Sequence, residues 1–151
     1  MPRIRQLKSA HGVLEGDERR KAQKLAASER QLNESEAKLA ELGSYREAYL
    51  RDFAARAGAG MSAARARDYQ AFLARLDEAL REQTEIAARA RVTRAELLAT
   101  WRGAARRSAA VDRALQRGLS EEQRRLERRE QRDADERAQG RWSAGGRRRV
   151  P

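Results

Sequence analysis

Few side chains in this sequence could carry out chemistry. The chain has one histidine, His11, and no cysteine, which removes thiolate nucleophiles and thiolate zinc sites. Carboxylates are numerous, but arginines stand near them along the chain, which is typical of solvated helix faces. An enzyme needs a nucleophile, a tuned acid–base pair or a metal, and none of these is recognisable. The sequence therefore predicts no catalytic, cofactor-binding or metal-binding residue.

The glycine-containing stretch Gly58-Ala59-Gly60 could in principle hold a phosphate. However, no strand precedes it and no Lys-Ser or Lys-Thr pair follows it, so the fuller phosphate-binding pattern is absent. We interpret the stretch as a plain turn. Ser62 is the predicted N-cap of the helix that follows, because its hydroxyl could accept a hydrogen bond from an amide of the first turn.

Aromatic and apolar residues on both sides of this turn could instead bind a partner. A two-helix seam needs about two large apolar positions per heptad on each helix. Residues 69–80 supply more than that, so a second apolar line runs beside the seam. Such an excess predicts an exposed patch that binds a partner, and the alternative is a wider seam that buries it. The residues of this predicted patch are Leu42, Tyr45, Tyr49, Phe72, Leu76, Ala79 and Gln83.

Two long helices must position these residues. Charged residues make up 38 % of the 151 positions and aromatic residues 5 %, a composition typical of coiled coils. We predict an all-α fold, an antiparallel two-helix coiled coil (αα-hairpin) that spans residues 1–139. Helix one should cover about 3–57, the turn 58–61 and helix two about 62–139. Residues 140–151 should form a basic disordered tail.

Apolar residues recur in heptads along both helices. In helix one the repeat runs through Leu7, Leu14, Leu25, Leu32 and Leu39. In helix two the predicted seam is Tyr69, Leu73, Leu76, Leu80, Gln83, Ala87, Ala90, Arg94, Leu97, Trp101, Ala104, Ser108, Val111 and Leu115. Folding at the turn places Tyr49 opposite Tyr69 and leaves roughly the last 20 residues of helix two as an overhang that has no pairing partner.

The positive charge is concentrated in the last third of the chain. The formal net charge is +11, and residues 102–151 carry 15 basic and 8 acidic groups. Such a segment favours an acidic protein, an anionic membrane surface or a nucleic acid. Trp142 among arginines could insert at a membrane interface or stack on a base, and the plainer interpretation is a solvated tail. No signal peptide or membrane span is expected.

The central part of the chain resembles the flagellar export protein family FliJ. The resemblance rests on Tyr45-x3-Tyr49, Met61-Ser62, Trp101-Arg102 and the segment Tyr69-Gln70-x-Phe72-Leu73-x2-Leu76-Asp77-Glu78-Ala79. Length, coiled-coil character and a basic C-terminus are similar along nearly the whole chain. The stalk proteins of virulence secretion systems are related to this family.

This resemblance implies a non-enzymatic stalk of the flagellar type III export apparatus. Its implied partners are a hexameric export ATPase, which it would enter and stimulate, the cytoplasmic linker of the export-gate membrane protein, and export chaperones that it would help to recycle. The resemblance places gate binding on the predicted patch. The ring contacts would lie at the helix ends, Arg3 to Leu14 and Leu115 to Arg137.

We further expect a cytoplasmic protein, monomeric when free, that associates peripherally with the inner membrane at the flagellar base. Three alternatives remain at this point: a basic coiled coil that binds nucleic acid, a generic structural coiled coil, and the equivalent stalk of a virulence type III secretion system. The first explains the charge but not the apolar patch. It also lacks a basic region that feeds a parallel zipper.

Overall fold

The computed structural model describes residues 2–147, and these form two α-helices. Helix α1 spans Pro2–Gly58 and helix α2 spans Ala63–Arg147, with no strand in this part of the chain. The predicted all-α antiparallel hairpin is confirmed. Alanine, leucine, glutamate and arginine dominate both helices, and these residues have the highest helix propensities. Pro2 stands at the first helical position, where its missing N–H costs nothing.

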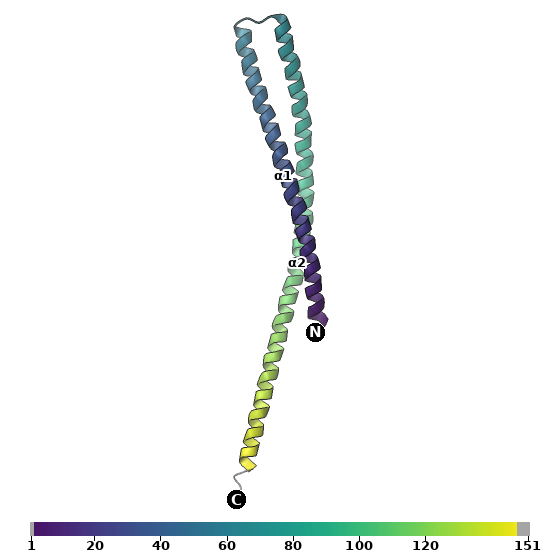
Figure 1. The fold of residues 1–151 in the computed structure, drawn as a ribbon, viewed down its shortest axis with the longest axis vertical. Coiled ribbons are helices and arrows are strands. Elements are labelled where there is room, and N and C mark those ends of the chain that lie inside the picture. The colour runs from purple at the N-terminus through teal and green to yellow at the C-terminus, as the bar shows by residue number, and fades with distance from the viewer. Residues whose placement is uncertain (1, 148–151) are drawn as a thin grey trace. The chain divides into compact units, whose positions relative to one another are not determined.

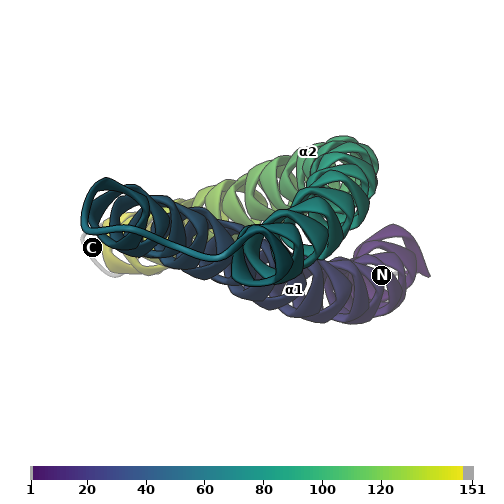
Figure 2. The same cartoon turned by 90° about the horizontal axis from the view of Figure 1, so that it is seen from above.

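Ala59–Ser62 form the short connection between the helices (Figures 1 and 2). Gly60 adopts a φ of 98°, a left-handed conformation that glycine reaches without steric cost. Arg65 N donates a hydrogen bond of 3.2 Å to Ser62 Oγ, and Ala66 N donates one of 3.0 Å to Ser62 O. The predicted N-cap is therefore confirmed, and the glycine-containing stretch is a turn.

The chain divides by internal contacts into two compact units. The first, which we call the loop unit, is Asp17–Ala104 and contains the connection between the helices. The second, the terminal unit, contains the described residues up to 16 and from 105 onward. Each helix therefore contributes to both units.

The core of each unit is the heptad seam. All fourteen predicted seam positions of α2 are buried or half-buried, and the five leucines of the α1 repeat are half-buried. In the loop unit the buried residues are Ser28, Leu76, Ala87 and Ala104, and in the terminal unit they are Ser108 and Leu115. Small residues therefore occupy much of the seam, and no large side chain among the described residues is fully buried.

The C-terminal part of α2 differs from the prediction. Helix two was expected to end at about residue 139, whereas α2 continues to Arg147, so the prediction of a disordered tail is wrong for residues 140–147. Residues 148–151 lie outside the described part. No proline interrupts this segment, and extending an existing helix needs no new nucleation, so α2 continues through its three glycines. The expected overhang is present, because every side chain from Gln123 to Gly145 is exposed.

Candidate partner-binding surface

Aromatic residues from both helices meet near the connection, inside the loop unit. The Tyr49 ring lies 4.9 Å from the Tyr69 ring and 4.7 Å from the Phe72 ring, measured between centroids. Tyr45 stacks on Tyr49 at 6.3 Å and meets Phe72 edge-on at 6.2 Å. The predicted register, with Tyr49 opposite Tyr69, is confirmed. Ring pairs of this kind add about 0.5–1.5 kcal/mol beyond the area that they bury.

The predicted patch spans different depths in the structure. Tyr45 is its outermost member, with 53 % of its surface exposed. Leu42, Tyr49, Phe72 and Ala79 are half-buried. Tyr49 and Phe72 contact the exposed Tyr45 ring, and an exposed aromatic ring is the kind of side chain that anchors a partner protein.

Two other members of the predicted patch serve the seam. Leu76 is only 7 % exposed, so it belongs to the core between the helices and supports the patch from beneath. Gln83 is half-buried, and its Nε2 donates a hydrogen bond of 3.2 Å to Ser35 O on α1. This bond fixes the amide of Gln83 against the opposite helix. A partner would therefore contact the other patch residues first.

A polar arrangement that the sequence did not reveal lies beside the aromatic cluster. Tyr69 donates its hydroxyl to Asp52 Oδ2 at 2.8 Å, and Arg56 Nε donates to Asp52 Oδ1 at 3.1 Å. These bonds, led by the one from Tyr69, lower the pKa of Asp52 below its usual range. The hydrogen bond to Asp52 in turn raises the pKa of Tyr69, and the same carboxylate raises the pKa of Arg56. The spacing of Asp52 and Arg56 by four could have predicted their pair, whereas the Tyr69 contact requires the exact register.

Ion pairs between the helices line one edge of the loop unit. Arg91 Nε lies 3.2 Å from Glu36 Oε1, and Arg94 Nη2 lies 3.5 Å from Glu29 Oε1. Arg46 pairs with Asp77 through a hydrogen bond of 2.5 Å. We call this the closed edge, defined by these three pairs.

The opposite edge of the loop unit has a different character. At about 100° per residue, Glu29 and Glu36 lie on one side of buried Ser28, and Gln31 and Lys38 lie on the other. We call this second side the open edge. It is defined on α1 by Gln31, Lys38 and Tyr45 and on α2 by Phe72, Ala79, Ile86 and Thr93. Apolar and aromatic side chains, with Tyr45 and Ile86 the most exposed of them, therefore reach the surface on this edge.

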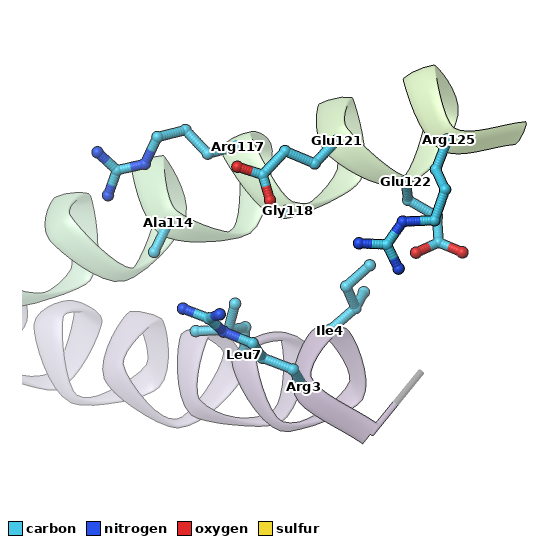
Figure 3. A pocket seen from close by; sticks show the side chains of 9 residues that line it. All are labelled: Arg3, Ile4, Leu7, Ala114, Arg117, Gly118, Glu121, Glu122 and Arg125. Atoms are coloured by element: carbon cyan, nitrogen blue, oxygen red, sulfur yellow. The ribbon is translucent and has the colours of Figure 1, made fainter. Parts of the chain in front are cut away.

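The terminal unit contains a separate cavity of about 320 Å³ between the start of α1 and α2. Figure 3 shows Ile4 and Leu7 directed from α1 toward α2, with charged side chains at the margin. The charged lining residues are Arg3, Arg117, Glu121, Glu122 and Arg125. This cavity falls within the helix ends where ring contacts were expected. Deeper in this unit, His11 Nε2 lies 3.7 Å from Asp112 Oδ1.

The described residues include no group of three or more histidines, aspartates or glutamates placed to hold a metal ion. Likewise, neither helix contains within its described residues an apolar stretch long enough to cross a membrane. The structure instead presents three surfaces: the aromatic patch, the open edge of the loop unit and the charged C-terminal part of α2. These surfaces suit binding to other proteins.

Comparison with protein families identified the family of this chain. The family model described as "Flagellar FliJ protein" matches residues 6–147, which is nearly the entire chain. Comparisons with curated proteins and with solved structures gave no match. The family match favours an export component over the nucleic-acid-binding and generic coiled-coil alternatives. The chain therefore belongs to the flagellar FliJ family, whose members are non-catalytic components of the flagellar protein export apparatus.

Proposed function

We propose that this protein is the stalk of the flagellar export ATPase. In this role the terminal unit enters the hexameric ATPase ring and stimulates ATP hydrolysis, while the loop unit binds the cytoplasmic linker of the export gate. The protein acts in the cytoplasm at the inner-membrane face of the flagellar base. It also returns emptied export chaperones to new cargo.

The observation that carries this proposal is the run of exposed side chains from Gln123 to Gly145. Leu126 and Trp142 are exposed within it, and Trp142 is 84 % exposed. A helix that presents large apolar side chains to water gains free energy when another protein covers them. Its arginines suit acidic loops that line a pore, through many weak and salt-screened contacts. Many weak contacts bind the stalk without holding it in one fixed position inside the ATPase ring.

The aromatic patch supports the second half of the proposal. Tyr45, Tyr49 and Phe72 are aromatic anchors of the kind that carry most of the free energy of protein–protein binding. The ring-binding and gate-binding surfaces use different residues, in the terminal unit and the loop unit. A variant can therefore lose one function and keep the other.

The test is ATP hydrolysis by the cognate export ATPase, with and without this protein, near physiological ionic strength of about 0.15 M. We expect stimulation by the full chain. A variant that lacks residues 123–151, and a full-length Leu126→Ser/Trp142→Ser variant, should both lose it. Phe72→Ala should keep it, because Phe72 lies in the loop unit.

Circular dichroism of each full-length variant provides the control. Leu126 and Trp142 are exposed and Phe72 is half-buried, so these substitutions should leave helicity nearly unchanged. Absence of stimulation at every ratio of stalk to ATPase would contradict the proposal. A titration with nucleic acid at several salt concentrations would then follow, since such binding weakens log-linearly with salt.

A further inference from the structure

A continuous groove runs along the open edge of the loop unit, beyond the aromatic patch. Two adjoining sections, each of about 390 Å³, share the lining residues Gln31, Glu34 and Thr93. On the α2 side the groove is lined by Ile86, Arg89, Ala90, Thr93 and Leu97. None of these α2 residues takes part in the three ion pairs of the closed edge.

The spacing of the lining residues fits a third helix. On α2 four of the five lining residues, Ile86, Ala90, Thr93 and Leu97, follow one another at steps of four, three and four residues. On α1 four of the eight lining residues, Ala27, Gln31, Glu34 and Lys38, follow the same steps. Two neighbouring helices that each present a heptad line to one groove form the acceptor surface of a three-stranded coiled coil. The groove is about 17 Å long from Ile86 to Leu97, or about three helical turns.

The charge around the groove indicates what kind of helix fits. Four cations line it, Lys24, Arg30, Lys38 and Arg89, against the single carboxylate of Glu34. Among the residues that the structure describes, none of the four cations has an ion-pair partner. On the closed edge, by contrast, the arginines are matched with carboxylates. The groove therefore has an excess of positive charge that an acidic partner would neutralise.

We propose that this groove binds an acidic amphipathic helix of a partner protein. The apolar stripe of that helix packs on Ile86, Ala90 and Leu97, and its flanking Glu or Asp residues pair with Lys38 and Arg89. Ile86 is 37 % exposed in the unbound chain, so its side chain is available to such a stripe. The inference rests neither on gate binding nor on ATPase stimulation, because none of the residues named for the site belongs to the predicted patch or to the terminal unit.

The test uses two synthetic 21-residue peptides and the full-length protein. Both peptides carry alternating leucine and alanine on the apolar stripe, which limits their self-association, and they differ only in having Glu or Lys at the flanking positions. Fluorescence anisotropy of the labelled peptides measures binding. We expect the Glu peptide to bind at least ~10-fold more tightly than the Lys peptide, which corresponds to ~1.4 kcal/mol.

Three variants locate the site. Ile86→Glu should weaken binding of the Glu peptide by ~10-fold or more, and Lys38→Glu/Arg89→Glu should reverse the preference toward the Lys peptide. Val92→Glu is the matched control, because Val92 is an exposed β-branched residue of α2 outside the groove lining. It should retain wild-type affinity. Phe72→Ala should also retain it, which separates this site from the aromatic patch.

The proposal is overturned if neither peptide binds, if both bind equally, or if Val92→Glu weakens binding as much as Ile86→Glu. Sedimentation of the chain alone provides a further check. A dimer that Ile86→Glu converts to monomer would assign the groove to a second copy of this chain, and would also overturn the proposal.

Discussion

The closed edge and the open edge are formed by the same two helices, yet they differ in chemistry. The closed edge joins α1 to α2 through Arg46–Asp77, Glu36–Arg91 and Glu29–Arg94. The open edge presents Tyr45, Phe72 and Ile86 and a groove rimmed by cations that have no ion-pair partner in the described chain. Hairpin formation needs only one seam. We therefore propose that a partner protein covers the apolar side chains of the open edge.

The contrast also separates two roles of charge. On the closed edge, opposite charges face one another and favour a single register of the two helices, although each exposed pair is worth only about 0.2–1 kcal/mol. On the open edge, four cations and the carboxylate of Glu34 line a groove, and none of these cations forms an ion pair with another described residue of the hairpin. The first pattern specifies the fold, and the second is suited to recognition.

The largest expected effect is on the free energy of unfolding, and it distinguishes a residue of the seam from one of the open edge. Leu76→Ala removes a core side chain and should cost about 2–4 kcal/mol in the free energy of unfolding. Ile86→Ala lies on the open edge and should cost less than about 1 kcal/mol, because its side chain is already partly hydrated. Urea unfolding followed by circular dichroism measures both. Equal costs would mean that the open edge belongs to the seam.

A smaller effect tests the closed edge. A double-mutant cycle of Glu36→Ala and Arg91→Ala should give a coupling free energy of about 0.2–1 kcal/mol that falls as salt is added. The same cycle on Glu34 and Arg89, which line the groove and do not pair, is the matched control and should give no coupling. A coupling on the open edge equal to that on the closed edge would remove the distinction between them.

The smallest effect concerns the polar group near the connection. Tyr69→Phe deletes the main hydrogen bond that lowers the pKa of Asp52, so that pKa should rise toward its ordinary value of 3.8. In the wild type, the stabilisation from Asp52 is present above that value and is lost as pH falls through the lowered pKa. The stabilisation from Tyr69, whose pKa is raised, is present below its ordinary 10.0 and is lost as pH rises through the raised value. NMR titration of the Asp52 carboxyl carbon measures the shift, and an unchanged pKa would show that Tyr69 is not the main cause.

Much of the fold could be predicted because the heptad pattern is a local property of the sequence. The heptad pattern identified the seam positions of α2 as far as Leu115. The N-cap at Ser62 could be predicted from residue type alone. The end of α2 was predicted too early, because a glycine- and arginine-rich segment resembles a disordered tail in composition, whereas a helix that is already formed can extend through it without a new nucleation step.

The surface was harder to predict than the seam. Tyr45, Tyr49 and Phe72 could be grouped from spacing, but the burial of Leu76 and the contact of Gln83 with Ser35 depend on how the helices rotate against each other. The closed edge depends on the same rotation. A shift of one residue in register would place Glu36 away from Arg91, and composition carries no information at that precision.

Tyr45 and Arg46 provide the most direct test of the two edges, because they are neighbours in the sequence that make contacts on different edges. Tyr45 stacks on Tyr49, whereas Arg46 pairs with Asp77. The measurement is the affinity of the export-gate linker for the wild type, Tyr45→Ala and Arg46→Ala. Tyr45→Ala should weaken binding ~10-fold or more, and Arg46→Ala should leave it nearly unchanged. Equal weakening by the two variants, or none by Tyr45→Ala, would contradict the assignment of partner binding to the open edge.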